Sequence, residues 1–147
     1  MGELVLKNAL VLIGSSESPT TTLTGHVKSA AVNYTVELQD KTAMMDGSRG
    51  RIAGLKDWNM TIEFNQDFGS TDYDKFFHGL VGTESTNSWL DIRPTTAKGG
   101  GTNPRYCGRG LLEGYSPLSG SVGDLAVTSL TFQGDGDLSR LVTTGPL

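Results

Sequence analysis

A short run, KDWNMTIEFN at residues 56–65, constrains the fold of this chain more than any other stretch. From its third residue onward, apolar and polar side chains alternate, which is the period of a β-strand with one buried face and one solvated face. The apolar face carries Trp58, Met60, Ile62 and Phe64. The polar face carries Asn59, Thr61, Glu63 and Asn65. We therefore expect a sheet that packs on a core on one side and meets water on the other.

A second alternating run lies at residues 26–38 and predicts another strand of the same kind. Its apolar face carries Val32, Tyr34, Val36 and Leu38. Its polar face carries Asn33, Thr35, Glu37 and, just past the run, Gln39. The polar faces of the two runs together hold eight residues, with two negative charges and no lysine or arginine.

The connection between these two strands, residues 40–54, follows neither the strand period nor the helix period. Irregular connections of this length are uncommon in a compact domain and are usually functional or disordered. Its apolar residues argue against disorder, because a solvated linker gains nothing from them. The segment is too short to have a core of its own, so we expect an assembly arm whose apolar surface is covered by a second subunit. The candidate arm residues are Met44, Met45, Asp46, Arg49, Arg51 and Ile52.

The rest of the chain predicts a β-rich fold in one domain over residues 1–147. Glycine accounts for 20 of the 147 residues, about twice its usual share, which favours many turns. One helix is expected at residues 70–81, where four apolar residues recur at spacings of three and four. Further strands are expected at residues 3–14, 89–94, 106–115, 125–133 and 138–142. In the strand at 106–115, a glycine face would let another backbone approach closely; its glycines are Gly108, Gly110 and Gly114.

Composition and motifs point away from catalysis. His26 and His78 lack metal-ligand spacing, and Cys107 has neither a CxxC motif nor an evident catalytic partner. We expect no enzyme activity, no cofactor and no metal. The net charge of −4 argues against a general nucleic-acid binder. The basic residues Lys98, Arg105 and Arg109 gather around a glycine-rich loop, where they are either solvated or face another copy of the chain. No signal peptide or membrane anchor is predicted.

Two longer runs carry a resemblance to a known family. They are SRGRIAGLKDWNMTIEFNQDF, followed by a short aromatic helix, and TNPRYCGRGLLEGYSPLSGSVGDLAVTSLTFQGDGDLSR. Together they resemble the phage tail tube protein, the major tail protein of long-tailed, non-contractile phages, over roughly residues 30–142. The resemblance implies a β-sandwich or partly closed barrel of two packed antiparallel sheets, with one short flanking α-helix and a long inter-strand loop.

The resemblance also implies a function. Six copies would form a ring, and stacked rings would form the hollow tail tube through which DNA is delivered into the host. The protein would be part of the virion tail, assembled in the bacterial cytoplasm. Its partners would be further copies of itself and the tape-measure, tail-terminator and tail-tip proteins, while DNA would pass without specific binding.

This implied function gives the eight polar residues of the two strands a role. A channel for DNA should be polar and not basic, because lysine and arginine contacts would retain the phosphates. The candidate lumen-lining residues are Asn33, Thr35, Glu37, Gln39, Asn59, Thr61, Glu63 and Asn65. A sheet that simply faces solvent would show the same pattern.

Three other functions remain open at this point. Another virion structural protein, such as a capsid decoration or tail-completion protein, would form a trimer or a ring that does not stack. A carbohydrate-binding β-sandwich module would need a cluster of exposed aromatic residues. A hydrolase ranks last, since no catalytic constellation is visible in the sequence.

Overall fold

The computed structural model describes residues 10–14, 21–22, 27–66, 73–82, 88–95 and 103–142. Within these ranges the chain is mainly β, as the sequence predicts, and one short helix interrupts the strands. The elements in chain order are β1 (Leu10–Gly14), β2 (Thr21–Thr22), β3 (Val27–Asp40), β4 (Arg51–Asn65), α1 (Tyr73–Leu80), β5 (Trp89–Arg93), β6 (Arg105–Ser116), β7 (Val127–Gly134) and β8 (Ser139–Leu141).

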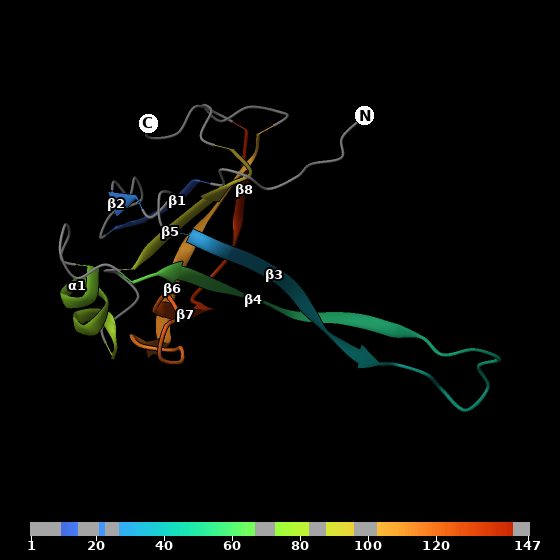
Figure 1. Ribbon diagram of the computed structural model, residues 1–147. Helices are drawn as coiled ribbons and strands as arrows, with labels where there is room; N and C mark the ends of the chain where they lie inside the picture. The colour runs from blue at the N-terminus through green and yellow to red at the C-terminus, as the bar shows by residue number, and fades with distance from the viewer. Residues whose placement is uncertain are drawn as a thin grey trace.

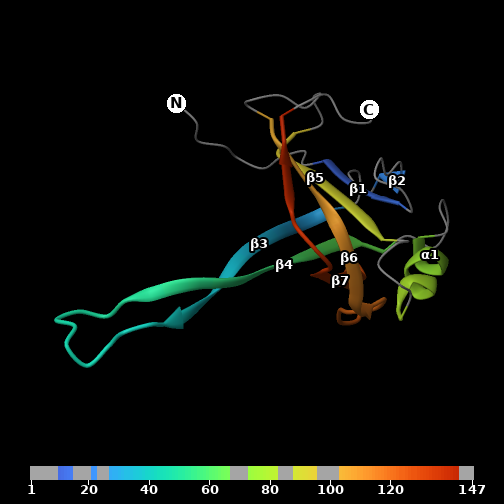
Figure 2. The same ribbon diagram turned by 180° about the vertical axis from the view of Figure 1, so that it is seen from behind.

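The strands form one antiparallel sheet that curls into a half-barrel (Figures 1 and 2). Its order is β2-β1-β5-β6-β7-β4-β3, and β8 pairs with β6. The first half of β6 pairs with β5 and β8, and its second half pairs with β7. The predicted sandwich or partly closed barrel is therefore confirmed. Its two layers are the two ends of one continuous sheet, which share β6 as their common strand.

The hydrophobic core fills one face of this curled sheet. The four apolar residues predicted for β4 are all buried: Trp58, Met60, Ile62 and Phe64. Residues of β1 and β5, among them Val11, Ile13 and Leu90, belong to the same cluster. Helix α1 adds Phe77, whose ring centroid lies 5.7 Å from that of Phe64. The predicted helix at 70–81 thus exists as residues 73–80, while its expected first residues, 70–72, lie outside the described ranges.

The indole of Trp58 lies against glycines of β6 and β7. A Cβ atom added to Gly134 would come within 2.5 Å of the indole atoms Cδ1 and Cε2, and one on Gly108 would lie 2.8 Å from Cζ2. The indole N–H donates a hydrogen bond to the carbonyl of Gly136 at 3.1 Å. At Gly108 the closest neighbour is therefore an aromatic side chain, where the sequence predicts a backbone. At Gly110 the prediction is correct, since the Gln133 carbonyl oxygen would lie 3.1 Å from an added Cβ.

The predicted glycine face of β6 is wrong for Gly114. The pairing of β6 with β7 shifts between Leu112 and Gly114, so Glu113 is an extra residue in the strand. Such a β-bulge inverts the alternation beyond it. Gly114 consequently points away from the core, with no atom within 4 Å of an added Cβ. Tyr115 points inward instead, and its hydroxyl donates a 2.6 Å hydrogen bond to Oδ1 of Asp74, which ties α1 to β6.

The packing of Trp58 gives a first prediction. Gly134→Ala should lower the free energy of unfolding by about 1–3 kcal/mol, because the added methyl group overpacks the indole site. Gly114→Ala is the matched control, since it makes the same change in a neighbouring strand with open space around it. Chemical denaturation of both variants measures the difference. Equal stability of the two variants would show that the indole is not confined by Gly134.

The hydrogen bond between Tyr115 and Asp74 gives a second prediction. Burial, followed by the hydrogen bond to the Asp74 carboxylate, raises the pKa of Tyr115 to about 12. The pKa of an unfolded tyrosine is about 10. Folding therefore favours the protonated phenol, so this contribution to stability is complete below pH 10 and is lost as the pH rises from about 10 to about 12. Tyr115→Phe should flatten the fall of stability across this window relative to the wild type. Parallel pH profiles for the two proteins would contradict the assignment.

Candidate functional site: a polar sheet face and a projecting hairpin

Strands β3 and β4 continue beyond the core as a two-stranded hairpin that projects from the body (Figure 1). Their pairing extends as far as Asp40 and Arg51, so the loop between them spans only residues 41–50. The prediction of an irregular connection over residues 40–54 is therefore correct for residues 41–50 and wrong at its two ends, which belong to β3 and β4. The reason is a β-bulge: Val36 pairs with Lys56 but Leu38 pairs with Ala53, so β4 contains one extra residue. The bulge resets the alternation and hides the strand period in the sequence.

The tip of the hairpin is held by hydrogen bonds of its own. The amide of Lys41 donates to the carbonyl of Gly50 at 3.0 Å, and the amide of Gly50 donates to the Thr42 hydroxyl at 2.9 Å. The amide of Ala43 donates to the Asp46 carboxylate at 2.7 Å. At the base of the loop, hydrogen bonds from the hydroxyl and the amide of Thr42 lower the pKa of Asp40. The tip thus has a defined shape within a single subunit.

The apolar residues of the hairpin are exposed in the described part of the subunit. Met44 and Met45 are fully exposed, and Ile52 and Leu55 are 57% and 81% exposed. Asp46 closes the turn of the tip, and Arg49 and Arg51 are exposed beside it. The six predicted arm residues therefore lie together on or near the tip, away from the core. Their contact with a second subunit stays a prediction.

The predicted polar faces of β3 and β4 form a single surface. Asn33 pairs with Asn59, and the Nδ2 group of Asn33 donates to Oδ1 of Asn59 at 3.1 Å. Directly paired residues of antiparallel strands share one face. The same register places seven of the eight candidates on this face: Asn33, Thr35, Gln39, Asn59, Thr61, Glu63 and Asn65. Glu37 has no direct partner because it lies opposite the extra residue of β4, but β3 keeps its own alternation there, so Glu37 lies on the same side, and its carboxylate accepts a 2.6 Å hydrogen bond from Gln39.

Strand β7 widens this surface with residues that the sequence analysis missed. They pair with the polar residues of β4 and are Ser129, Thr131 and Gln133. Asp57, which pairs with Thr35, and Ser29, which donates a 3.2 Å hydrogen bond to Glu63, were missed as well. The signal was present, since polar and apolar residues also alternate along β7. We call the polar residues of β3, β4 and β7 on this side the polar face.

The polar face is acidic. It carries the carboxylates of Glu37, Asp57 and Glu63, and Gln133 donates a 2.7 Å hydrogen bond to Glu113 beside it. In the register of β3, β4 and β7, no lysine or arginine is paired on this face, and Lys28 is exposed at the β3 bulge beside Ser29. Lys56 pairs with Val36 on the opposite side of the sheet. The surface therefore offers hydrogen-bonding groups and more negative than positive charge.

The basic residues near the glycine-rich loop do not form the surface patch that the sequence suggests. Arg105 is buried, and both its Nε and its Nη2 lie 2.8 Å from Oδ2 of the buried Asp91. The guanidinium of Arg109 lies over the ring of Trp89, 5.7 Å from the ring centroid. Lys98 falls outside the described residues. The two arginines that can be placed therefore have partners within their own subunit.

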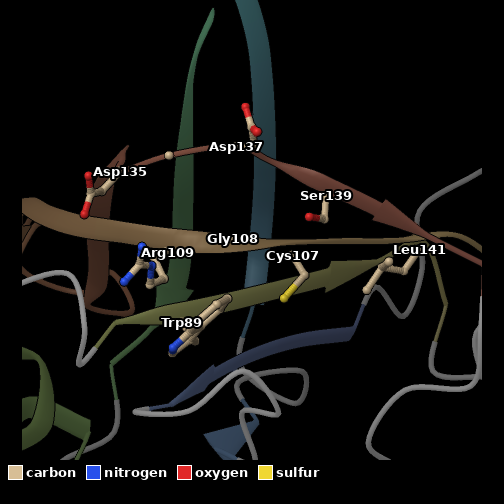
Figure 3. Close-up of a pocket in the computed structure, with 9 residues that line it drawn as sticks. Trp89, Cys107, Gly108, Arg109, Asp135, Asp137, Ser139 and Leu141 are labelled. Atoms are coloured by element: carbon tan, nitrogen blue, oxygen red, sulfur yellow. The ribbon is translucent and has the colours of Figure 1, made fainter.

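A pocket of about 230 Å³ opens beside β6 (Figure 3). It is lined by Trp89, Cys107, Gly108, Arg109, Asp135, Gly136, Asp137, Ser139 and Leu141. The thiol of Cys107 is almost fully buried, and the lining includes no histidine that could serve as its base. Among the residues that the structure describes, no group of histidine, cysteine or acidic residues is arranged to hold a metal ion. In the same ranges, no helix is long and apolar enough to cross a membrane.

Comparison with known proteins adds a likeness of fold. No protein-family model matches the sequence, and neither does any curated protein. Among solved structures, a chain of the PVC sheath/tube terminator, from an extracellular contractile injection system, matches with a TM-score of 0.71 and 12% identity over 95% of this chain and 96% of that one. A chain of the PVC sheath-tube complex matches with a TM-score of 0.70 and 11% identity, over 96% and 93% of the two chains.

A third match comes from a tail structure. A chain of the tail of an empty gene transfer agent particle, described with C6 symmetry, matches with a TM-score of 0.59 and 19% identity. The match covers 89% of this chain and 95% of that one. At these identities the likeness establishes a shared fold. It extends over nearly the whole length of both chains in all three cases.

Proposed function

We propose that this protein is a structural subunit of a phage-type tail tube, which assembles into hexameric rings that stack around a channel for DNA. The observation that carries the proposal is the fold, which is shared almost end to end with chains of tail and sheath-tube assemblies, one of them described with C6 symmetry. The protein would belong to the tail of a virion or a related particle. Three surfaces of this chain would serve the ring, the stack and the channel of such a tube.

Ring formation would use the free edge of the sheet. Strand β3 is the last strand in the sheet order, and along its 14 residues one edge of backbone groups is unpaired by any other strand that the structure describes. Its apolar face is partly exposed where the strand leaves the core. The exposed fraction is 45% for Tyr34, 40% for Val36 and 57% for Leu38. A long apolar edge is an aggregation hazard in a monomer. In a ring, the next subunit would cover it.

Stacking would use the projecting hairpin. Its methionines at the tip are covered by nothing in their own subunit, and methionine side chains adapt readily to an apolar partner surface. A contact that joins two different patches and does not close on itself produces an open array of copies. The hairpin would therefore link one ring to the next. The polar face would line the channel, where its net negative charge lets DNA slide past.

Electron microscopy of the concentrated, purified protein tests this function. We expect tubes of uniform diameter whose cross-section averages with sixfold symmetry. Trimers, or rings that do not stack, would instead indicate a capsid decoration or tail-completion protein. A persistent monomer at high concentration would contradict the proposal.

Removal of the hairpin tip should separate folding from stacking. Replacing residues 41–50 with Asn-Gly closes the hairpin directly after the last strand pair, in the turn that two-residue hairpins favour. The variant should remain folded, with an unfolding temperature close to that of the wild type, because the tip lies outside the core. It should no longer form tubes in the electron microscope. Normal tubes from this variant would exclude the hairpin tip as the stacking contact.

Reversing the charge of the polar face should change how assembled tubes treat DNA. Glu37→Lys with Glu63→Lys should leave the tubes intact but make them retain a fluorescent single-stranded oligonucleotide, and this retention should weaken as salt rises. Asp135→Lys with Asp137→Lys makes the same charge change in the β7–β8 turn, at residues outside the candidate lumen-lining set, and should have no such effect. Co-sedimentation measures the retained fraction. Equal retention by both double variants would place the polar face outside the channel.

A further inference from the structure

The connection between β6 and β7, residues 117–126, presents apolar side chains to solvent. Leu118 and Leu125 are 67% and 68% exposed, and Val122 is fully exposed. We call residues 117–126 the β6–β7 loop. In an ordinary surface loop these positions would be polar, because exposed apolar side chains gain nothing from water. The sequence predicts a strand that already begins at Leu125, whereas β7 begins at Val127, so Leu125 belongs to the loop.

Hydrogen bonds hold the β6–β7 loop in a defined conformation. The amide of Asp124 donates to the carbonyl of Ser121 at 2.9 Å, and the amide of Val127 donates to the carbonyl of Ser119 at 3.0 Å. Gln66, just past the end of β4, holds both ends of the loop. Its amide donates to the carbonyl of Ala126, and its side-chain Nε2 donates to the carbonyl of Pro117, each at 3.0 Å. The three apolar side chains are therefore displayed on a fixed backbone, which lowers the entropic cost of binding a partner.

The β6–β7 loop lies at the opposite end of the sheet from the hairpin tip. Strand β4 connects the two ends. At its start Arg51 pairs with Asp40 below the tip, and at its end Asn65 pairs with Val127, directly after the loop. Figure 1 shows the same arrangement, with the β6–β7 connection near α1 and the hairpin tip pointing away from it. The subunit thus has an exposed apolar feature at each end of one long strand.

The two features also complement each other in charge. Residues 41–51 at the tip contain three basic residues and one acidic residue. The β6–β7 loop contains one acidic residue, Asp124, and no basic residue. Two copies of the loop would offer each other like charges, and so would two tips. A tip against a loop brings together opposite charges and two apolar surfaces, which favours the head-to-tail contact over both head-to-head alternatives.

We propose that the β6–β7 loop is the seat for the hairpin tip of another copy of this chain. Met44 and Met45 of one subunit would pack on Leu118, Val122 and Leu125 of the next. Because the two surfaces stand at opposite ends of the sheet, every added subunit leaves one free tip and one free seat. The contact is therefore heterologous, and it forms an open axial stack when the rotation between successive subunits does not close into a ring. This inference rests on the proposed stacking function and names its second surface.

Cross-linking between two variants, each with one added cysteine, tests the seat. Met45→Cys is mixed with Val122→Cys, one of them carrying a tag that shifts its mass, and a short bis-maleimide is added. The native Cys107 stays in place because it is buried and shielded from the reagent. We expect a covalent dimer of the two variants, at least several-fold more abundant than either homodimer. The control mixture pairs Met45→Cys with Val142→Cys, an apolar residue after β8 that is 47% exposed.

The outcomes separate the seat from the tube. If tubes form but the Val122 mixture gives no more mixed dimer than the control, the seat is wrong and the tube function stands. If mixed dimers form without tubes, the seat stands and the proposed function fails. If neither appears at the highest concentration reached, both fail.

A charge variant provides a second readout. Val122→Asp cannot disturb the core, because this side chain is fully exposed. It should raise the protein concentration needed for tube formation at least about tenfold, since the carboxylate would be desolvated against the methionines. Val142→Asp introduces the same charge outside the seat and should leave that concentration unchanged. Equal assembly of the two variants would overturn the proposal.

Discussion

The packing of the Trp58 indole on Gly108 and Gly134 is the contact on which the rest of the structure depends. Only residues without a Cβ allow an aromatic ring to lie so close to strands β6 and β7. The indole also satisfies its own N–H by reaching the Gly136 carbonyl in the β7–β8 turn. One side chain of β4 thereby joins three strands and the turn behind them. The curl of the sheet, and with it the separation of a core face from a polar face, is held at this point.

Strand β4 serves folding and assembly with different residues. Its alternate side chains fill the core, and the residues between them build the polar face. Its first residues leave the body altogether and support the hairpin tip. Since these three sets barely overlap, the surfaces assigned to assembly can be exposed, charged or apolar without weakening the core. This division explains why a folded single subunit can carry so many exposed apolar residues at the hairpin and at the β6–β7 loop.

Local pattern in the sequence was sufficient for part of the structure. Strict alternation predicts the buried residues of β4 and the shared polar side of Asn33 and Asn59, because strand period is a property of neighbouring residues. The apolar face of α1 follows from spacing in the same way. The β-rich class follows from the glycine content and the alternating runs.

The remaining features depend on contacts between distant residues, which local pattern does not report. The bulges at Glu113 and opposite Glu37 invert the alternation in mid-strand, so Gly114 and the hairpin were misassigned. The burial of Arg105 depends on Asp91, 14 positions away on another strand. The β6–β7 loop resembles any polar turn until the structure shows which of its side chains face solvent.

The length of the hairpin has a further consequence, because the number of residue pairs in a β-ribbon fixes both its reach and the side that its tip presents. Each residue added to both strands lengthens it by about 3.3–3.4 Å, and an addition of one residue turns the tip over so that its opposite side faces the partner. Only additions of two residues per strand, about 7 Å, keep the same side facing forward. If the tip sets the distance to the next subunit, that distance can change between related proteins only in such steps. A bulge such as the one opposite Glu37 is the one local device that shifts the phase between them.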